Sequence, residues 1–369
     1  MFATMNKTKP IHFRRLLIST FVLIAAAAIV KIVSLYPEWI EKYYSTGIYI
    51  YISVFIRAIT RWFPFSFGDV LYAVFAIFLV IKLVNIIKAI VRKTVTRQSF
   101  FLSILKIIRF FLWLYLVFNI FWGLNYNRLG IAYQLQIQPE KYSTQELKAL
   151  TDSLVMKLNF ARRSLGDSTY QYPSDKEIFA QTIVAYGNVE KRFPFLHYNQ
   201  PCIKSSLYGK PGDYLGFEGY YNPFTAESQV NTTIPAFLIP YTTTHEVAHQ
   251  LGYGDEDEAN FVGYLTAKAS TDMVFHYSVY FDLFNYANGE LFFRDSVAAR
   301  ANYHALDTLV KRDEKIYRKF LIEYRNPVDH YITILYGDYL KANNQPRGMD
   351  TYDEVVAWLI AYQKKYGAL

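Results

Sequence analysis

Residues His245-Glu246-Val247-Ala248-His249 form the pattern H-E-x-x-H within an apolar segment that is compatible with a helix. Positions i and i+4 lie on one face of a helix, so both imidazoles can reach the same metal ion. Glu246 then lies beside the first ligand, where a carboxylate can take a proton from a water molecule that the metal activates. The pattern therefore predicts that His245 and His249 bind one Zn²⁺ ion and that Glu246 is the catalytic base.

Three carboxylates just after this motif compete for the third ligand position: Asp255, Glu256 and Glu258. We expect Glu256, because Glu256-x-x-Ala-Asn260 resembles the E-x-x-A-D/N signature of gluzincin peptidases, in which a Glu on a second helix completes the site. Asn260 lies four residues later on the same face and would orient a ligand. Asp255 is the rival, since the stretch from the first His to Asp255 is similar to the elongated metzincin pattern with Asp as its last ligand. Glu258 is the remaining alternative.

Two interpretations without catalysis stay open. The acidic run also fits a solvated helix start, because carboxylates are favourable at a helix N-terminus; this explains Asp255 and Asp257 but not the motif before them. The second is a non-catalytic membrane scaffold whose metal site only stabilises the fold. Structural zinc sites usually have four protein ligands, often Cys, whereas three are visible here and the single Cys202 lies far upstream. One Cys also excludes an internal disulfide.

The positive charge is concentrated at one end of the chain. The sequence has 369 residues, is 52% hydrophobic and carries a net charge of +8. Residues 1–109 contain 15 Lys or Arg and 3 Asp or Glu, whereas the remainder contains 24 basic and 28 acidic residues. Basic charge beside apolar segments indicates a lipid bilayer as partner, and the part with the motif has no basic patch that would suit a nucleic acid.

Three apolar stretches are long enough to span a bilayer: residues 16–36, 70–87 and 100–124. A cleaved signal peptide is the alternative for the first. Residues 43–67 are aromatic-rich but interrupted by charges, so we expect an interfacial helix there. Were this segment a fourth span, the topology after it would reverse.

Basic residues precede the first span, and others lie in the loop after the second span. This distribution predicts that the N-terminus and that loop are both cytoplasmic. Three spans then place everything after residue 124 outside the cytoplasm, in the periplasm of a cell with two membranes. We expect a membrane domain over residues 1–124 and an extracytoplasmic domain over residues 125–369, with residues 125–138 as an exit linker.

The C-terminal domain shows mainly helical patterns with a short strand-rich part, which predicts an α+β fold. Capping boxes begin helices at Ser143, Ser174 and Thr351, each with a Glu three residues later. Glycines punctuate strand-like runs over residues 200–235. A strand just before the metal helix would line the cleft and pair with an extended substrate, or would belong to an ordinary core hairpin.

The chain resembles a family of bacterial membrane proteins, mainly from Bacteroidota, filed as a domain of unknown function. The resemblance lies in Phe121-Trp122-Gly123-Leu124-Asn125-Tyr126, Tyr221-Asn222-Pro223-Phe224-Thr225, His245-Glu246-x-x-His249-Gln250-x-Gly252 and Glu256-x-Glu258-Ala259-Asn260-Phe261. It covers most of the chain and implies three N-terminal membrane helices followed by an extracytoplasmic, gluzincin-like domain. It implies no particular substrate.

Together these observations predict a membrane-anchored zinc endopeptidase of the bacterial cytoplasmic membrane, with a zincin-like domain and a peptide or protein as its substrate. A donor for the oxyanion of the transition state is also needed. The sequence offers several and does not choose among them: Tyr253, Tyr264, His276, His304, His330 and Tyr336.

Overall fold

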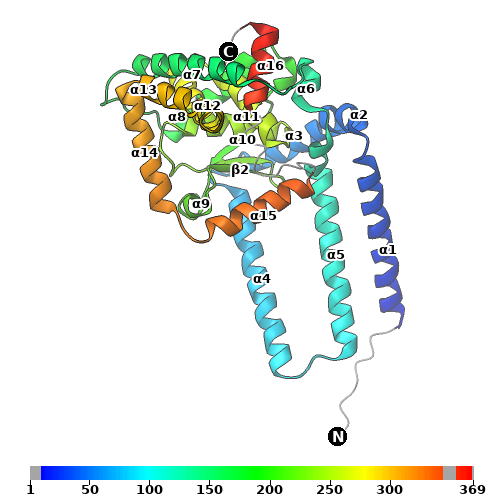
Figure 1. The fold of residues 1–369 in the computed structure, drawn as a ribbon. Coiled ribbons are helices and arrows are strands. Elements are labelled where there is room, and N and C mark those ends of the chain that lie inside the picture. The colour runs from blue at the N-terminus through cyan, green and yellow to red at the C-terminus, as the bar shows by residue number, and fades with distance from the viewer. Residues whose placement is uncertain (1–9, 344–354, 368–369) are drawn as a thin grey trace.

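Three long helices extend from one side of a mainly helical body in the computed structural model, which describes residues 10–343 and 355–367 (Figure 1). They are α1 (Pro10–Val33), α4 (Phe67–Val91) and α5 (Arg97–Phe121). All three contain windows long and apolar enough to cross a membrane, with at most 11% of each window buried. The chain rises along α1, descends along α4 and rises again along α5. The prediction of three candidate spans is confirmed.

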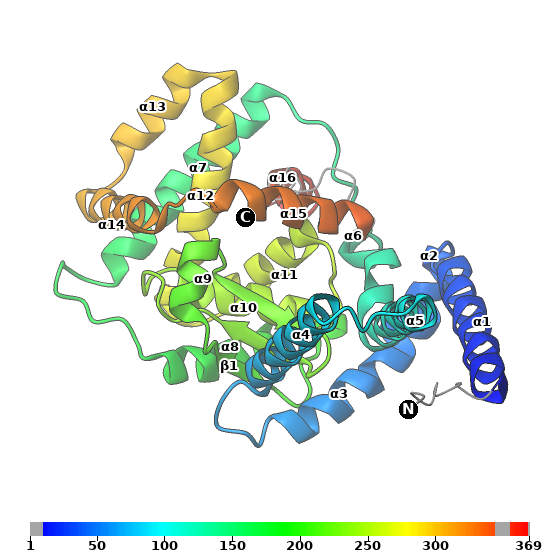
Figure 2. The same ribbon diagram turned by 90° about the horizontal axis from the view of Figure 1, so that it is seen from below.

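The segment between the first two spans lies against the body. It consists of α2 (Pro37–Trp39), the π-helix η1 (Ile40–Ile48) and α3 (Tyr49–Thr60), and Figure 2 shows α3 running along the body toward α4. Tyr49 is 1% exposed and Arg57 is 2% exposed, whereas Tyr51 and Trp62 are 77% and 80% exposed. One face of this segment is buried in protein, and among the described residues it is not one of the helices that are long and apolar enough to cross a membrane.

The expectation of an exit linker at residues 125–138 is wrong. The short 3₁₀ helix η2 (Gly123–Asn127) follows α5 directly, and α6 (Gly130–Leu135) follows it. Asn125 is 1% exposed and Ile131 is completely buried. The end of the last span therefore continues into the core of the body.

The body is built from helices around one small sheet. The helices before the sheet are α7 (Thr144–Ser164), α8 (Asp175–Val189) and η3 (Pro194–Leu196), and both expected capping boxes, at Ser143 and Ser174, are formed. The later helices are α9 (Gly209–Leu215), α10 (Ile239–Gln250), α11 (Glu256–Lys268), α12 (Met273–Arg294), α13 (Ser296–Ala305), α14 (Thr308–Tyr324), α15 (Asp329–Ala342) and α16 (Val355–Tyr366). The third capping box, Thr351 to Glu354, lies outside the described residues.

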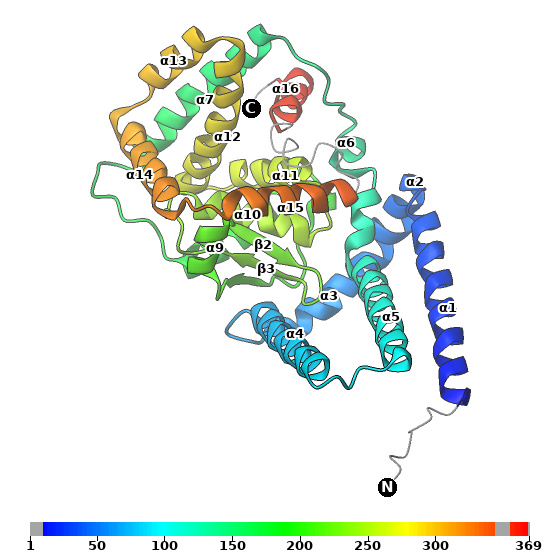
Figure 3. The ribbon, with the colours of Figure 1, turned by 60° about the horizontal axis from the view of Figure 1, so that its bottom comes forward.

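The sheet has three strands in the order β1-β3-β2. β1 (Ile203–Ser205) is parallel to β3 (Glu227–Val230), and β2 (Gly219–Asn222) is antiparallel to β3, with Gly219 opposite Val230. Every residue of β3 is buried, whereas β2 is at the edge of the sheet. Figure 3 shows the sheet beside α10, with α15 lying across the same region.

Candidate metal centre

Helices α10 and α11 cross closely enough to bring their polar residues together. Pro240 at the start of α10 suits the first turn, where a backbone N–H has no helical partner. Gly263 of α11 lies at the crossing, and a β-carbon there would be 3.2 Å from the backbone nitrogen of His245. Because Gly263 carries no side chain, the two backbones can approach and the first turn of α11 faces the H-E-x-x-H segment.

His245, His249 and Glu256 converge on one point. The two Nε2 atoms are 3.1 Å apart, and Oε2 of Glu256 is 3.2 Å from Nε2 of His245 and 3.4 Å from Nε2 of His249. Ligand atoms at zinc bond lengths of about 2.0 Å in a tetrahedron are about 3.3 Å apart. The three groups are thus spaced as a tetrahedral zinc site requires, and they form the group that could hold a metal ion.

Neighbouring groups fix the orientation of these side chains. Nδ1 of His249 is 2.7 Å from the carbonyl oxygen of Tyr253, which directs Nε2 toward the site. The hydroxyl of Tyr336 donates to Oε1 of Glu256 at 2.7 Å, leaving Oε2 for the imidazoles. Burial lowers the pKa of His245, and hydrogen bonds from Glu256 and Asn260 oppose this effect. Asn260 also lines the cavity, and its role in orienting a ligand stays a prediction.

The charges of the site favour a proton held between acid and base. Burial alone would lower the pKa of His249, but the charge and hydrogen bond of Glu256, with smaller effects of Glu246 and the Tyr253 carbonyl, together outweigh burial and raise that pKa to about 9. Burial alone would raise the pKa of Glu256, but the charge of His249 and hydrogen bonds from both imidazoles hold it well below 4.5. A metal ion would replace this shared proton, since ligation requires neutral imidazoles and an ionised carboxylate.

The structure does not bring the other two acidic candidates to the site. Asp255 precedes the first turn of α11 and is outside the group of converging ligands. Glu258 points away: its Oε1 accepts a hydrogen bond from the backbone of Ile131 at 2.8 Å. Gly130 has φ +69°, and a β-carbon there would lie 1.7 Å from Oε1 of Glu258. Glu258 therefore joins α11 to α6.

Glu246 lies in a cavity beside the three converging groups. Its side chain is 4% exposed, and Oε2 has no hydrogen-bond partner among the residues that the structure describes. Burial raises the pKa of Glu246 to about 8. The edge strand β2 passes directly over it, since a β-carbon on Gly219 would be 2.6 Å from Oε1 of Glu246. The carboxyl group is thus buried, unpaired and in contact with the strand that lines the cavity.

The cavity has a volume of about 550 Å³ and is bounded by elements distant in the sequence. Its walls come from the end of α5 and η2, from β2, α10, α11 and α12, and from α15, which lies across it (Figure 3). The sequence did not predict that three residues of this wall lie together at the site: Trp122, Gly219 and Tyr336. Tyr336 appeared only among six possible donors, and no local pattern links it to α10.

The other residues considered as donors to the oxyanion either form hydrogen bonds with other groups or lie away from the cavity. The hydroxyl of Tyr253 donates to Gln134 at 2.6 Å, and Nε2 of His276 is 2.8 Å from the carbonyl oxygen of Ser270. Tyr264 is fully buried in the core. His304 lies at the end of α13 and does not line the cavity. The side chain of His330 is outside the part of the structure that is described.

Residues next to the candidate spans donate hydrogen bonds to the carbonyl groups at the C-terminal end of α10. The last carbonyl groups of a helix have no partner within it. Trp122 donates to the carbonyl of His249 at 2.9 Å, Tyr49 donates to that of Gln250 at 2.9 Å, and Arg128 donates to that of Gly252 at 3.1 Å. Each donor comes from a segment next to α1 or α5, so α10 ends on the bases of these two candidate spans.

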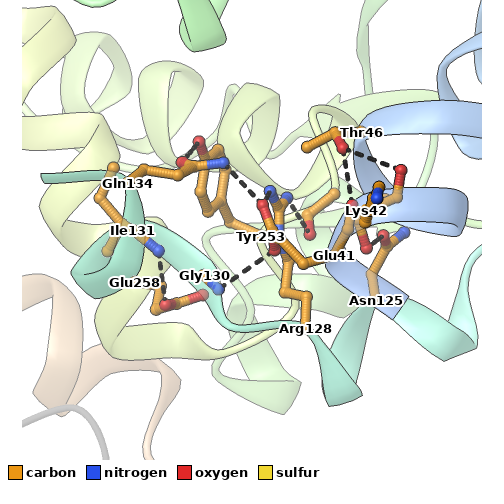
Figure 4. A network of polar contacts seen from close by, with 12 residues as sticks. Glu41, Lys42, Thr46, Asn125, Arg128, Gly130, Ile131, Gln134, Tyr253 and Glu258 are labelled. Atoms are coloured by element: carbon orange, nitrogen blue, oxygen red, sulfur yellow. Dashed lines mark hydrogen bonds and ion pairs between the residues drawn. The ribbon is translucent and has the colours of Figure 1, made fainter. Parts of the chain in front are cut away.

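A buried polar network reinforces this junction (Figure 4). Arg128 forms two hydrogen bonds of 2.8 Å with Glu41 of η1, and its guanidinium lies 4.7 Å from the centre of the Tyr253 ring. Gln134 donates to Glu41 at 3.0 Å and accepts from Tyr253. Since the carbonyl of Tyr253 holds His249, the network connects η1 to the orientation of a candidate ligand.

Fold and site define a mainly helical protein with three candidate membrane-spanning helices and a buried His-His-Glu group. The chain belongs to the family described as protein of unknown function (DUF3810), which matches residues 44–360. The match begins within η1, after α1 and Glu41, and includes α4, α5 and all residues of the candidate site. No curated protein and no solved structure matches the chain.

Proposed function

We propose that this protein is a membrane-anchored, zinc-dependent endopeptidase with a zincin-like, gluzincin-type site. The observation that carries the proposal is the convergence of His245, His249 and Glu256 within 3.4 Å, beside a buried, unpaired Glu246 in a cavity. Three protein ligands leave one tetrahedral position open, which is the arrangement of catalytic rather than structural zinc sites.

Zinc bound by these three residues would supply a Lewis acid that lowers the pKa of water toward neutrality. Glu246, buried beside the three candidate ligands, would accept a proton from water activated there and would pass it to the leaving amine. The edge strand β2 lines the cavity and offers its backbone to an extended peptide.

The test compares the full-length protein, purified in detergent, with its Glu246→Gln variant. We expect both proteins to contain one zinc ion and only the wild type to cleave a peptide library, with a loss of about 10²–10⁴-fold or more in the variant. Glu258→Gln is the matched control, because it removes a buried carboxylate of the neighbouring helix that points away from the site. Equal cleavage by wild type and Glu246→Gln would refute the mechanism, and zinc without any cleavage would favour a structural role.

We further infer that the candidate site faces away from the cytoplasm. The beginning of α1, which carries Arg14 and Arg15, and the segment between α4 and α5, which carries Arg92 and Lys93, lie at the far end of the helices from the body (Figure 1). In a Cys202→Ser background, a new Cys at exposed Ser168 should react with a membrane-impermeant thiol reagent when only the outer barrier is permeabilised. A Cys at exposed Thr94 should react only after lysis. The reverse pattern would place the site in the cytoplasm.

A further inference from the structure

The cavity of the candidate site contains two more carboxyl groups that the proposed mechanism does not use. Glu218 directly precedes the edge strand β2, and Asp282 lies in the middle of α12. Both line the cavity that contains Glu246 and the three converging ligands. They approach it from two different elements; burial raises the pKa of both carboxyl groups, and the charge of Glu218 raises the pKa of Asp282 further.

These two carboxyl groups have no positive partner in the described structure. Thr242 donates a hydrogen bond to Glu218 at 3.3 Å, and Asp282 makes neither a hydrogen bond nor an ion pair with any residue in the described ranges. No Lys or Arg is among the residues that line the cavity. Both residues are half-buried, and carboxylates withdrawn from water are normally paired, so a cationic ligand suits this pair.

The surroundings of the pair suit a cation with an apolar stem. Tyr241 and Tyr286 line the same wall, and the charges of Glu218 and Asp282 raise the pKa of both hydroxyl groups beyond the effect of burial. Aromatic faces attract ammonium and guanidinium groups and pack against aliphatic carbons. Glu246, which is 4% exposed and has an oxygen without a partner among the described residues, lines the same cavity.

We propose that Glu218 and Asp282 form a subsite that binds a positively charged group of the substrate. This inference rests on the proposed function for its substrate, a peptide bound along β2. Glu218 is next to Gly219, the residue that contacts Glu246, so the cationic group lies close to the peptide bond that is cleaved. The bound group is a Lys or Arg side chain or a free terminal amine, all of which present N–H donors and a positive charge.

Binding is measured first, on the full-length, zinc-loaded Glu246→Gln protein, where cleavage does not interfere. Four fluorescent peptides share one sequence: Lys or norleucine at one position, each with a free or an acetylated N-terminus. A hydrogen bond to a charged group contributes about 1.5–3 kcal/mol, so the preferred cation should bind about 10- to 100-fold more tightly than its neutral counterpart. The Lys–norleucine comparison and the free–acetylated comparison separate the two sources of charge.

The preference should disappear when the subsite is neutralised. Glu218→Gln and Asp282→Asn, alone and combined, keep the side-chain volumes and should reduce the ratio of the two affinities to near one. Each ratio compares two peptides on one preparation, so a partial loss of folded protein cancels. Asp152→Asn is the control, since it removes an exposed carboxylate of α7 outside the cavity and should leave the ratio unchanged.

The outcomes separate this inference from the proposed function. Selective binding of cationic peptides without cleavage by the wild type would support the subsite and refute the peptidase. Cleavage by the wild type with equal affinity for charged and neutral peptides would overturn the subsite and leave the peptidase intact. A second zinc ion in the wild type that is lost in the double variant would also overturn the inference, because the pair would then be a metal site.

Discussion

Replacing Gly219 by Ala should impair the chemistry of the site without removing its metal. A β-carbon at this position would lie 2.6 Å from Oε1 and 2.7 Å from Cγ of Glu246, whereas ordinary contacts begin near 3.4 Å. The strand cannot easily retreat, because Gly219 is paired with Val230 in the sheet. The carboxyl group of Glu246 must therefore move by about 0.8 Å, and a misplacement of about 1 Å in a catalytic group can cost about 100-fold in rate.

A 100-fold loss in kcat/KM corresponds to about 2.7 kcal/mol of transition-state stabilisation. The backbone of Gly219 is not left-handed, so Ala introduces no strain of its own, and fewer unfolded conformations even favour the variant slightly. The zinc content and the melting temperature should accordingly stay close to those of the wild type. The assay is peptide cleavage at several substrate concentrations, with zinc analysis of the same preparations.

Gly187→Ala is the matched control, because a β-carbon there would meet nothing within 4 Å and the residue lies on the exposed side of α8. We expect this variant to cleave peptides as the wild type does. If Gly219→Ala retained full activity, Glu246 would not need its observed position, and its role as the base would be refuted. Loss of zinc from Gly219→Ala would show instead that the substitution disturbs the ligands.

Three further predictions concern the third metal ligand, its hydrogen bond to Tyr336 and the buried ion pair of Glu41. Glu256→Gln should empty the metal site, whereas Glu258→Gln should retain zinc, as measured by metal analysis; the reverse result would reassign the third ligand. Tyr336→Phe removes the 2.7 Å hydrogen bond to Glu256 and should weaken zinc binding about 10- to 100-fold in competition with a chelator, and an unchanged affinity would exclude this support. Glu41→Gln leaves Arg128 buried without its partner and should cost about 3–5 kcal/mol, seen as a lower melting temperature in detergent. Burial alone would raise the pKa of Glu41, but the hydrogen bonds and charge of Arg128 together with hydrogen bonds from Gly130 and Gln134 outweigh burial and lower it below 4.5. The wild type should therefore lose this stabilisation as the pH falls through the folded-state pKa, and the variant should not show that loss.

The local part of the site follows from helical spacing. Glu256 and Asn260 are four residues apart and share a face of α11, whereas Glu258, two residues on, points to nearly the opposite side. The structure brings Glu256 to the two imidazoles and directs Glu258 to α6, as this geometry requires. The capping boxes at Ser143 and Ser174 are equally local and were predictable for the same reason.

The distant part of the site does not follow from local patterns. Trp122, Gly219 and Tyr336 reach the cavity from three elements whose relative placement depends on packing of the whole body. The linker expected at residues 125–138 was inferred from its position after a span, because the sequence there has no strong periodicity. Its burial becomes visible only when Arg128 and Gln134 are seen with their partners on η1.

The attachment of α10 to the bases of the candidate spans limits how far the candidate site can move relative to these helices. Trp122, Tyr49 and Arg128 bind three carbonyl groups within one turn of His249, so the helix cannot pivot independently of the spans. In the proposed membrane orientation, a site held in this way would stay at a fixed height above the bilayer, whereas a site on a flexible stalk would sample many heights. For a substrate anchored in the same membrane, this junction would therefore fix the distance between the membrane and the cleaved bond. It would thus set the number of residues between the substrate's own span and that bond.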